Sequence, residues 1–553
     1  MCFVRVYITM AQDDRDSLKL LKTMRGEVNW EIVDERCAFL NQFYLLIENW
    51  QGQLPNLKSI FRPEEIDWLL TEDVKIFERV GRLHRIPIAN FVYNTGYEDE
   101  PVVDEDGKPL TRRTTAIHYS ASCKISELIG DLFEIYSSVD VNYTDDSGFT
   151  HFHAACMSSE CYNVVELFLE QGLDPNLLVP KTGESPLHLA LRWGRNKVAQ
   201  LLLRNGADPN LTNAEGLTPL HIICKRGEDD TGVYRKGDCV TVKMLLELSS
   251  EKYQPVQIDA RDKLGNTPLH LVLDYGHRRL IELLLKNGAD PNSINEHGFT
   301  PLHIISMRKY DEALAKLFFE INDKMNQKVE VDAKDKFGRT PLQWAVAKLL
   351  PSEVDALLER GADLSNFVFP TEDYFGVRLG QWNQSMPLRF QFRLTSGALG
   401  VVGSLEKRGY ELDRSQALMI MKIFAKHGLF EKPAILGEAW YDDEKFVREA
   451  KEIIIRPNLS FYGLIQLRPE EAAELLTWFY AGTLLPLSEG PREAFALHVC
   501  EKVSRRFFQS WALDCFLELI HCRLPILCCD MIIEELLNED LYNICLAVEG
   551  QNS

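Results

Sequence analysis

Histidine side chains recur along the middle of the sequence, and an imidazole can bind a metal, transfer a proton or form two hydrogen bonds. Each of six histidines ends a tetrapeptide that begins with Thr or Ser and has an apolar residue in third place. They are His118, His153, His188, His221, His270 and His303. His151 forms a His-x-His pair with His153, but no Cys or carboxylate set accompanies the pair as a zinc site requires. We therefore expect the six histidines to be structural and the chain to bind no metal.

The sequence also lacks the usual catalytic signatures. It has no Gly-rich phosphate-binding loop, no His-Glu-x-x-His motif and no Gly-x-Ser-x-Gly motif. The residues therefore indicate neither catalysis by this chain nor a bound cofactor, and we expect a protein that is not an enzyme.

The tetrapeptide is well suited to the start of a helix. Its Thr or Ser can accept a hydrogen bond from a first-turn amide, and Pro in second place loses only an N–H group that has no partner there. The apolar residue then points into a core, and the His can tie its own turn to the next one. The cleanest copies are Ser185-Pro186-Leu187-His188, Thr218-Pro219-Leu220-His221, Thr267-Pro268-Leu269-His270 and Thr300-Pro301-Leu302-His303. Looser copies begin at Thr115 and Thr150, and a seventh, from Thr340 to Gln343, has Gln in place of His.

The copies return with a period near 33 residues. They begin at residues 115, 150, 185, 218, 267, 300 and 340. An apolar helix and a Gly-Ala-Asp turn follow several of them, as at Gly206 and Gly288. This combination is the signature of the ankyrin repeat. The resemblance implies an all-α fold in which about seven repeats stack over residues 111–366, because one repeat alone would leave an apolar face in water.

Helical segments are expected on both sides of the repeats. Residues 1–110 read as a helical N-terminal region, whose acidic stretch from Glu98 to Asp106 is interpreted as a solvated loop. Residues 367–522 are expected to form a helical C-terminal domain. Residues 523–553 form a last segment with a pattern of its own.

Composition and charge indicate a soluble protein inside the cell. The 553 residues carry a formal net charge of −21 and are 45% hydrophobic, so cores are expected, whereas the basic footprint that binds nucleic acid or anionic membrane is missing. No apolar run reaches the ~18 residues that span a bilayer. The 13 cysteines show no pairing rhythm, which suits a reducing compartment. We expect a cytoplasmic or nuclear protein that binds neither nucleic acid nor membrane.

The concave face of the repeats is expected to hold a target protein. Positions seven and eight after each Thr or Ser end the first helix of a repeat, and several carry residue types that dominate interface energies. These positions are Arg192 and Trp193, Lys225 and Arg226, Asp274 and Tyr275, and Met307 and Arg308. Trp193, flanked by Arg192 and Arg195, is the strongest candidate, and its basic surroundings favour an acidic patch on the target. In the alternative interpretation, these positions vary freely and contribute little.

The last thirty residues contain a second motif. Leu524-Pro525 precedes an amphipathic helix rich in Ile and Leu, and Asn538-Glu539-Asp540 restarts a second short helix. A small apolar hairpin at the end of a chain often docks on another protein.

This spacing resembles the first part of an F-box. Ankyrin repeats followed by a truncated terminal F-box are similar to the PRANC family of poxviruses, Wolbachia and parasitoid wasps, and the stretch from Ile88 to Tyr97 also resembles the wasp members. The resemblance implies a substrate adaptor, whose repeats hold an unknown target while the F-box binds the Skp-family subunit of a cullin–RING ubiquitin ligase. The implied Skp-binding residues are Leu524, Pro525, Ile532, Leu536, Asp540, Leu541 and Ile544. The sequence departs from a full F-box because it ends soon after Ile544, without the later helix.

Three other interpretations stay open at the level of the sequence. The terminal helix pair could merely cap the C-terminal domain. The run from Leu519 to Leu524 is faintly similar to a SOCS box, which would recruit elongin instead. The repeats could also mask a partner without ubiquitin transfer, as ankyrin inhibitors of the IκB type do. Solvent access to the apolar face of the terminal hairpin distinguishes an adaptor from a masking scaffold.

Overall fold

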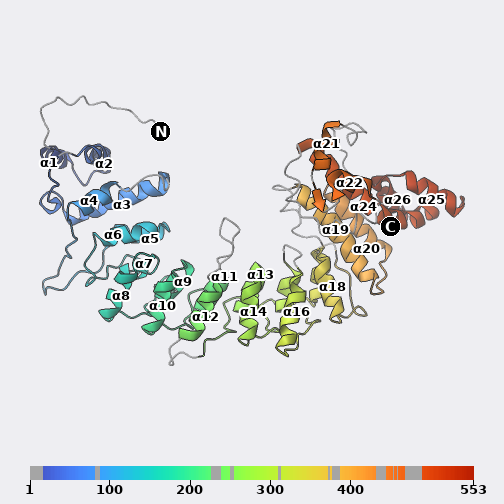
Figure 1. The fold of residues 1–553 in the computed structure, drawn as a ribbon, viewed down its shortest axis with the longest axis horizontal. Coiled ribbons are helices and arrows are strands. Elements are labelled where there is room, and N and C mark those ends of the chain that lie inside the picture. The colour runs from blue at the N-terminus through green and yellow to red at the C-terminus, as the bar shows by residue number, and fades with distance from the viewer. Residues whose placement is uncertain are drawn as a thin grey trace. The chain divides into compact units, whose positions relative to one another are not determined.

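The computed structural model describes residues 17–50, 52–80, 87–225, 238–248, 255–308, 313–371, 374–375, 387–430, 444–452, 454–456, 459–467 and 489–552. These residues are mostly helical, and Figure 1 labels many of the helices in chain order. The chain divides into two compact units, Met1–Tyr275 and Gly276–Ser553. The division falls inside the repeat that begins at Thr267.

The N-terminal region packs around aromatic side chains. Its helices are α1 (Ser17–Glu27), α2 (Val33–Glu48), α3 (Pro63–Val80) and α4 (Pro87–Asn94), with a 3-10 turn η1 at Leu57–Ser59. Phe39 and Phe43 of α2 stack with ring centroids 5.5 Å apart, and the ring of Phe61 contacts both. Phe91 of α4 packs edge-on against Phe43. An aromatic core, rather than a repeat pattern, therefore holds these helices together.

Helix pairs of the repeats follow in the first unit. They are α5 (Ala116–Ser122) and α6 (Glu127–Phe133), α7 (His151–Ala155) and α8 (Tyr162–Glu170), α9 (Pro186–Arg192) and α10 (Asn196–Arg204), and α11 (Pro219–Lys225) and α12 (Asp238–Leu248), followed by α13 (Pro268–Tyr275). The first helices α9, α11 and α13 pack in order, and the second helices α8, α10 and α12 do the same (Figure 1). The Leu in third place of each clean tetrapeptide here, Leu187, Leu220 and Leu269, is fully buried.

The second unit continues the repeats. Its helices are α14 (Arg278–Lys286), α15 (Pro301–Ser306), α16 (Leu314–Lys324), α17 (Pro341–Ala347) and α18 (Pro351–Glu359). Helices α14, α16 and α18 pack in order, and α15 packs on α17. The buried carboxylate of Glu353 in α18 accepts the backbone N–H groups of Leu314 and Ala315 over 2.8 Å each, so one repeat caps the helix of its neighbour. Every predicted tetrapeptide thus begins a helix in the described residues.

The C-terminal domain is also helical. Its elements are α19 (Pro387–Glu406), α20 (Arg414–Lys426), α21 (Glu444–Glu452), an antiparallel ribbon of β1 (Ile454–Arg456) and β2 (Leu459–Ser460), α22 (Phe461–Gln466), α24 (Glu489–Leu519), α25 (Ile526–Glu535) and α26 (Asn538–Asn552). The long helix α24 packs against α19, α25 and α26. None of the described helices, α24 included, combines the length and apolar character needed to cross a membrane.

Flanking helices pack directly on both ends of the repeats. Helix α3 contacts α5 in the first unit, and α18 contacts α19 in the second. The second contact is close because Gly397 and Gly400 of α19 lack side chains. A Cβ atom at Gly397 would lie 2.7 Å from the Leu349 carbonyl oxygen, and one at Gly400 would lie 2.9 Å from the Pro351 Cβ. The apolar ends of the stack are therefore covered by helices, as terminal repeats require.

The acidic loop before the first repeat is only partly solvated. Asp99 is 2% exposed, and its carboxylate accepts hydrogen bonds from Arg113 Nη1 (3.1 Å) and from the Tyr143 hydroxyl (2.8 Å). Arg113 Nε also donates to Asp67 of α3 over 2.7 Å. The interpretation of this stretch as a solvated linker is therefore wrong at Asp99, because a buried ion pair there joins α3 to the first repeat.

Candidate protein-binding surfaces

The tetrapeptide histidines tie successive repeats together. Nδ1 of His188 accepts the backbone N–H of Ser185 (3.3 Å), and Nε2 donates to the Leu217 carbonyl of the next repeat (2.9 Å). A neutral imidazole that carries its proton on Nε2 satisfies both bonds. The matching carbonyls belong to Tyr143 for His118, Leu177 for His153, Asn266 for His221 and Arg339 for His303. The geometry gives these side chains a structural role.

Burial keeps these imidazoles neutral. It lowers the pKa of His153 and of His188 to about 4, and it lowers the pKa of His118, His221 and His303 as well. Protonation at Nδ1 would also place a second donor against a backbone N–H. Because an efficient general base has a pKa near the working pH and a free nitrogen, these histidines are unsuited to catalysis.

Two residues that differ from the clean tetrapeptide form hydrogen bonds of their own. Gln343 replaces His: its Oε1 accepts the N–H of Thr340 (2.9 Å), and its Nε2 donates to the Val368 carbonyl (3.0 Å). His151 replaces Pro, and its Nε2 lies 2.7 Å from Thr115 Oγ1 of the preceding repeat. Among the residues that the structure describes, no group of three or more His, Cys, Asp or Glu could hold a metal ion.

Most predicted target-binding positions of the first unit reach the surface. Arg192 is exposed and forms an ion pair with Glu184, and Trp193 beside it is half-buried. Asp274 and Tyr275 are both exposed. These side chains are accessible to a partner, and their role in binding stays a prediction.

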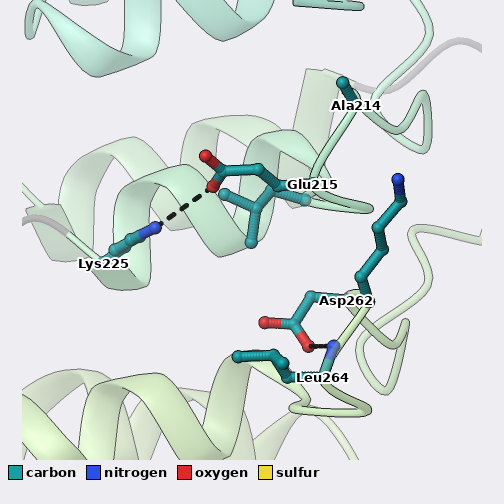
Figure 2. Close-up of a pocket in the computed structure, with 7 residues that line it drawn as sticks. Ala214, Glu215, Lys225, Asp262 and Leu264 are labelled. Carbon is teal, nitrogen blue, oxygen red and sulfur yellow. Dashed lines mark hydrogen bonds and ion pairs between the residues drawn. The ribbon is translucent and has the colours of Figure 1, made fainter.

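Lys225 borders a pocket between two successive repeats, which Figure 2 shows. The pocket has a volume of about 230 Å³ and is lined by Ala214, Glu215, Leu217, Lys225, Asp262, Lys263 and Leu264. Lys225 Nζ lies 3.3 Å from Glu215 Oε2, and Asp262 Oδ1 accepts the backbone N–H of Leu264 over 2.9 Å. Its size and mixed charges suit a side chain of a protein partner rather than a drug-sized apolar molecule. The neighbouring Arg226 lies outside the described residues.

The structure corrects the prediction for Arg308. Met307 is half-buried, but Arg308 is only 8% exposed. The Arg308 guanidinium lies over Gly276, where an added Cβ atom would come within 2.7 Å of the Arg308 Cζ. Arg308 therefore fills the space that a missing side chain leaves, and its predicted contact with a target is wrong.

Arg195, expected beside Trp193 on the binding face, forms bonds within the first unit. Its Nε donates to the Met157 carbonyl and its Nη2 donates to Ser126 Oγ, each over 2.8 Å. The guanidinium thus reaches both preceding repeats. Arg192 is therefore the exposed cation next to Trp193, whereas Arg195 links its own repeat to the two repeats before it.

The terminal helix pair is anchored on α24. Asn538 at the start of α26 is buried, and its Nδ2 donates to the Glu501 carbonyl (3.0 Å) and to Ser504 Oγ (2.9 Å). The buried residues on α26 include Leu541, Cys545 and Val548. Helix α26 also contacts α20. It is therefore a core element of the C-terminal domain.

Helix α25 presents apolar side chains to solvent. The exposed residues are Leu524, Ile526, Leu527, Met531 and Ile532, and we call this set the terminal apolar face. Leu527 is 73% and Met531 is 69% exposed, one helical turn apart, whereas Cys529 and Ile533 are buried against the domain. The hairpin therefore leaves a substantial apolar surface without cover from the described residues.

The predicted Skp-binding residues divide between this face and the core. Leu524, Pro525 and Ile532 are exposed. Leu536 and Ile544 are half-buried, and exposed Asp540 accepts the Leu537 N–H over 3.1 Å. Leu541 is 0% exposed, so its predicted contact with a Skp subunit is wrong, because it fills the core beside α24.

Sequence reasoning overlooked Leu527 and Met531, the two most exposed apolar side chains of α25. Their spacing of four residues was a usable signal, since it places them on one helix face. Their distinction from buried Ile533 required the position of α24.

Comparison with known proteins identifies the repeats. Residues 102–213, 187–295 and 275–367 match the family model of ankyrin repeats. Human ankyrin repeat and IBR domain-containing protein 1 is 27% identical over 223 residues, which cover 35% of this chain and 20% of that protein. The nuclear factor NF-κB p105 subunit of Gallus gallus is 30% identical over 210 residues, 36% of this chain and 20% of that protein. Neurogenic locus notch homolog protein 1 of Xenopus laevis is 30% identical over 257 residues, 42% of this chain and 10% of that protein.

The chain spans a fifth or less of the length of these relatives. A crystal structure of the ankyrin repeat domain of Bcl-3, described as a unique member of the IκB protein family, aligns with 24% identity and a TM-score of 0.33. That alignment covers 40% of this chain and 90% of the Bcl-3 domain. The helix pairs and the family match together confirm that the middle of the chain consists of stacked ankyrin repeats, a fold that binds proteins.

Proposed function

We propose that the chain is a substrate adaptor. The ankyrin repeats hold a target protein, and the terminal apolar face binds the Skp-family subunit of a cullin–RING ubiquitin ligase. The observation that carries this proposal is the exposure of Leu527 and Met531 on a helix whose partner, α26, is fixed to α24. The resemblance of the last segment to an F-box supplies the class of partner.

The exposed side chains are large enough to drive an association. Full burial of one Leu or Met side chain contributes about 1.5–3 kcal/mol, and about 1.4 kcal/mol corresponds to a tenfold change in affinity. Leu527 and Met531 keep most of their surface in water. A partner that covers both therefore gains more than a tenfold advantage over one that covers neither.

Capture of a purified Skp-family subunit by the full-length chain tests the proposal. The double variant Leu527→Asp with Met531→Asp places two carboxylates in the terminal apolar face and should weaken capture at least tenfold. Leu45→Asp is the matched control, because Leu45 is an exposed apolar residue on α2, 63% exposed and outside the terminal segment. All three changes lie at exposed sites, so the melting temperature should stay the same.

Absence of capture by the unaltered chain, or full capture by the double variant, contradicts the adaptor role. The alternative is then a masking scaffold, whose repeats cover a partner without ubiquitin transfer. This alternative requires only the ankyrin repeats, which the family model matches. A target that binds the repeats and is not ubiquitinated in a reconstituted ligase reaction would identify the scaffold.

A further inference from the structure

The turn before the last repeat is rigid. Asp335 is buried, and its Oδ1 accepts the backbone N–H groups of Phe337 (2.8 Å) and Arg339 (2.9 Å). Its Oδ2 accepts the indole N–H of Trp344 over 2.9 Å. The Lys336 N–H also donates to the His297 carbonyl of the preceding turn over 3.1 Å. The backbone of this turn is thus held in place before any partner arrives.

This rigid turn projects an aromatic ring into solvent. Phe337 is 72% exposed, although a Phe gains from burial and nothing in the described part of the chain covers it. The Arg339 guanidinium carbon lies 5.0 Å from the centre of the Phe337 ring and 4.1 Å from that of Tyr374. The Trp344 ring lies 5.1 Å from the same carbon and packs against Tyr374 with centroids 5.6 Å apart. One cation therefore sits among three rings, and one of those rings is open to a partner.

The same turn carries more positive than negative charge. Lys334 and Lys336 are exposed beside Phe337. In the described residues, Lys336 has one distant carboxylate partner, Glu296 at 4.0 Å, and Lys334 and Arg339 have none within that distance. The adjacent Asp335 is fully engaged in holding the turn. The turn is thus locally cationic in a chain whose net charge is −21.

We propose that Phe337, Arg339, Trp344 and Tyr374, with Lys334 and Lys336, form a docking site for an acidic peptide segment that carries an apolar side chain. The apolar side chain packs on the open Phe337 ring, and the carboxylates pair with the two lysines. Trp, Tyr and Arg on a fixed support are the side chains that dominate interface energies. The inference rests on the protein-binding role proposed above and names the chemistry of the target.

A protein segment fits this site better than a nucleic acid does. Salt screens charges beyond about 8 Å, so a short acidic peptide responds mainly to the lysines at the site. A long polyanion would also meet the repulsion of the acidic remainder of the chain.

Selection of random twelve-residue peptides on the full-length chain tests the inference. Peptides with Asp or Glu around one apolar or aromatic residue should be enriched. A synthetic peptide of the selected sequence should then bind at least tenfold more weakly to Phe337→Ser and to the double charge reversal Lys334→Glu with Lys336→Glu. Leu45→Ser is the matched control, because Leu45 is a comparably exposed apolar residue, 63% exposed, on α2 and outside the repeats; binding should be unchanged.

Failure of selection to enrich such peptides, or equal binding by Phe337→Ser, overturns the docking site. So does an equal loss in Leu45→Ser, or displacement of the peptide by a twelve-residue oligothymidylate. Skp capture is measured separately and should be normal in Phe337→Ser, since it depends on α25. If the unaltered chain captures the Skp subunit but binds no selected peptide, only the docking site is contradicted. If it binds the peptide but does not capture the Skp subunit, the ligase role is contradicted and the docking site stands.

Discussion

Arg195 donates a hydrogen bond from Nη2 to the Ser126 hydroxyl over 2.8 Å, although 69 positions separate the two residues. Ser126 lies two repeats before Arg195, and Nε of the same guanidinium donates to the Met157 carbonyl of the repeat between them. Stacked repeats usually gain stability from nearest neighbours alone. Here one side chain connects three consecutive repeats of the first unit.

Arg195→Ala should therefore destabilise the first unit. Hydrogen bonds from a charged donor contribute about 1.5–3 kcal/mol each, so the free energy of unfolding should fall by about 2–4 kcal/mol. Chemical denaturation followed by circular dichroism measures this loss. Arg192→Ala is the control, because Arg192 is exposed and an ion pair near the surface, such as the one it forms with Glu184, is worth below about 1 kcal/mol. Equal losses in the two variants would show that Arg195 does not fasten the repeats.

Acid should weaken the repeats through their buried histidines. The pKa of His188 is about 4 in the fold and about 6.5 in an unfolded chain. Protons therefore bind the unfolded chain preferentially as the pH falls. The stability that neutral His188 contributes is complete above pH 6.5 and is lost between pH 6.5 and 4, by about 3 kcal/mol in total.

His188→Gln should reduce this acid sensitivity and keep the fold at pH 7.5. Gln343 already forms both hydrogen bonds at the equivalent position of another repeat and carries no titrating group. Urea denaturation at pH 7.5, 6.5, 5.5 and 4.5 compares the variant with the unaltered chain. Both proteins contain every other titrating group, such as Asp73, whose pKa burial raises to about 6. The difference between their stabilities therefore reports the contribution of His188. If the free energy of unfolding fell equally with pH in both proteins, His188 would not be a source of the acid sensitivity.

Arg113→Leu should loosen the N-terminal helices. It leaves the carboxylates of Asp67 and Asp99 without their cation, and breaking such a buried pair costs about 3–5 kcal/mol. Hydrogen exchange should accelerate in α3. The loss should shrink as the pH falls from 7 to 5, because burial raises the pKa of Asp67 and protonation then neutralises its stranded carboxylate. Arg112→Leu, whose partner Asp146 is exposed at 3.3 Å, should have little effect. Unchanged exchange in α3 would mean that the ion pair does not couple the two regions.

Two leucines of the terminal segment should separate stability from binding. Leu541→Ala removes a fully buried side chain and should cost about 2–5 kcal/mol of unfolding free energy. Leu527→Ala changes an exposed side chain and should leave stability within about 0.5 kcal/mol, while it weakens Skp capture. Thermal unfolding and capture are measured on both variants. A large stability loss in Leu527→Ala would show that the terminal apolar face is covered by the chain itself.

Local patterns were sufficient to predict the repeats. Ser185 caps a helix that begins at Pro186, as the tetrapeptide indicates, because the required bonds join residues three positions apart. Arg308 has the same repeat position as Trp193, yet it is buried, because the space over Gly276 becomes visible only when the chain folds. Leu541 was predicted to be accessible for a similar reason. An amphipathic pattern identifies the apolar face of a helix but does not show which element covers that face.

The bond from His188 Nε2 to the Leu217 carbonyl has a consequence for how such a chain can change over time. Its acceptor belongs to the main chain, which every amino acid supplies, so the receiving repeat needs no particular side chain. A gene segment for one repeat can therefore be duplicated, deleted or exchanged while the stacking register persists. Arg195 sets a limit to this freedom, since it needs the hydroxyl of Ser126 two repeats earlier. A rearrangement of the first three repeats would therefore break this hydrogen bond.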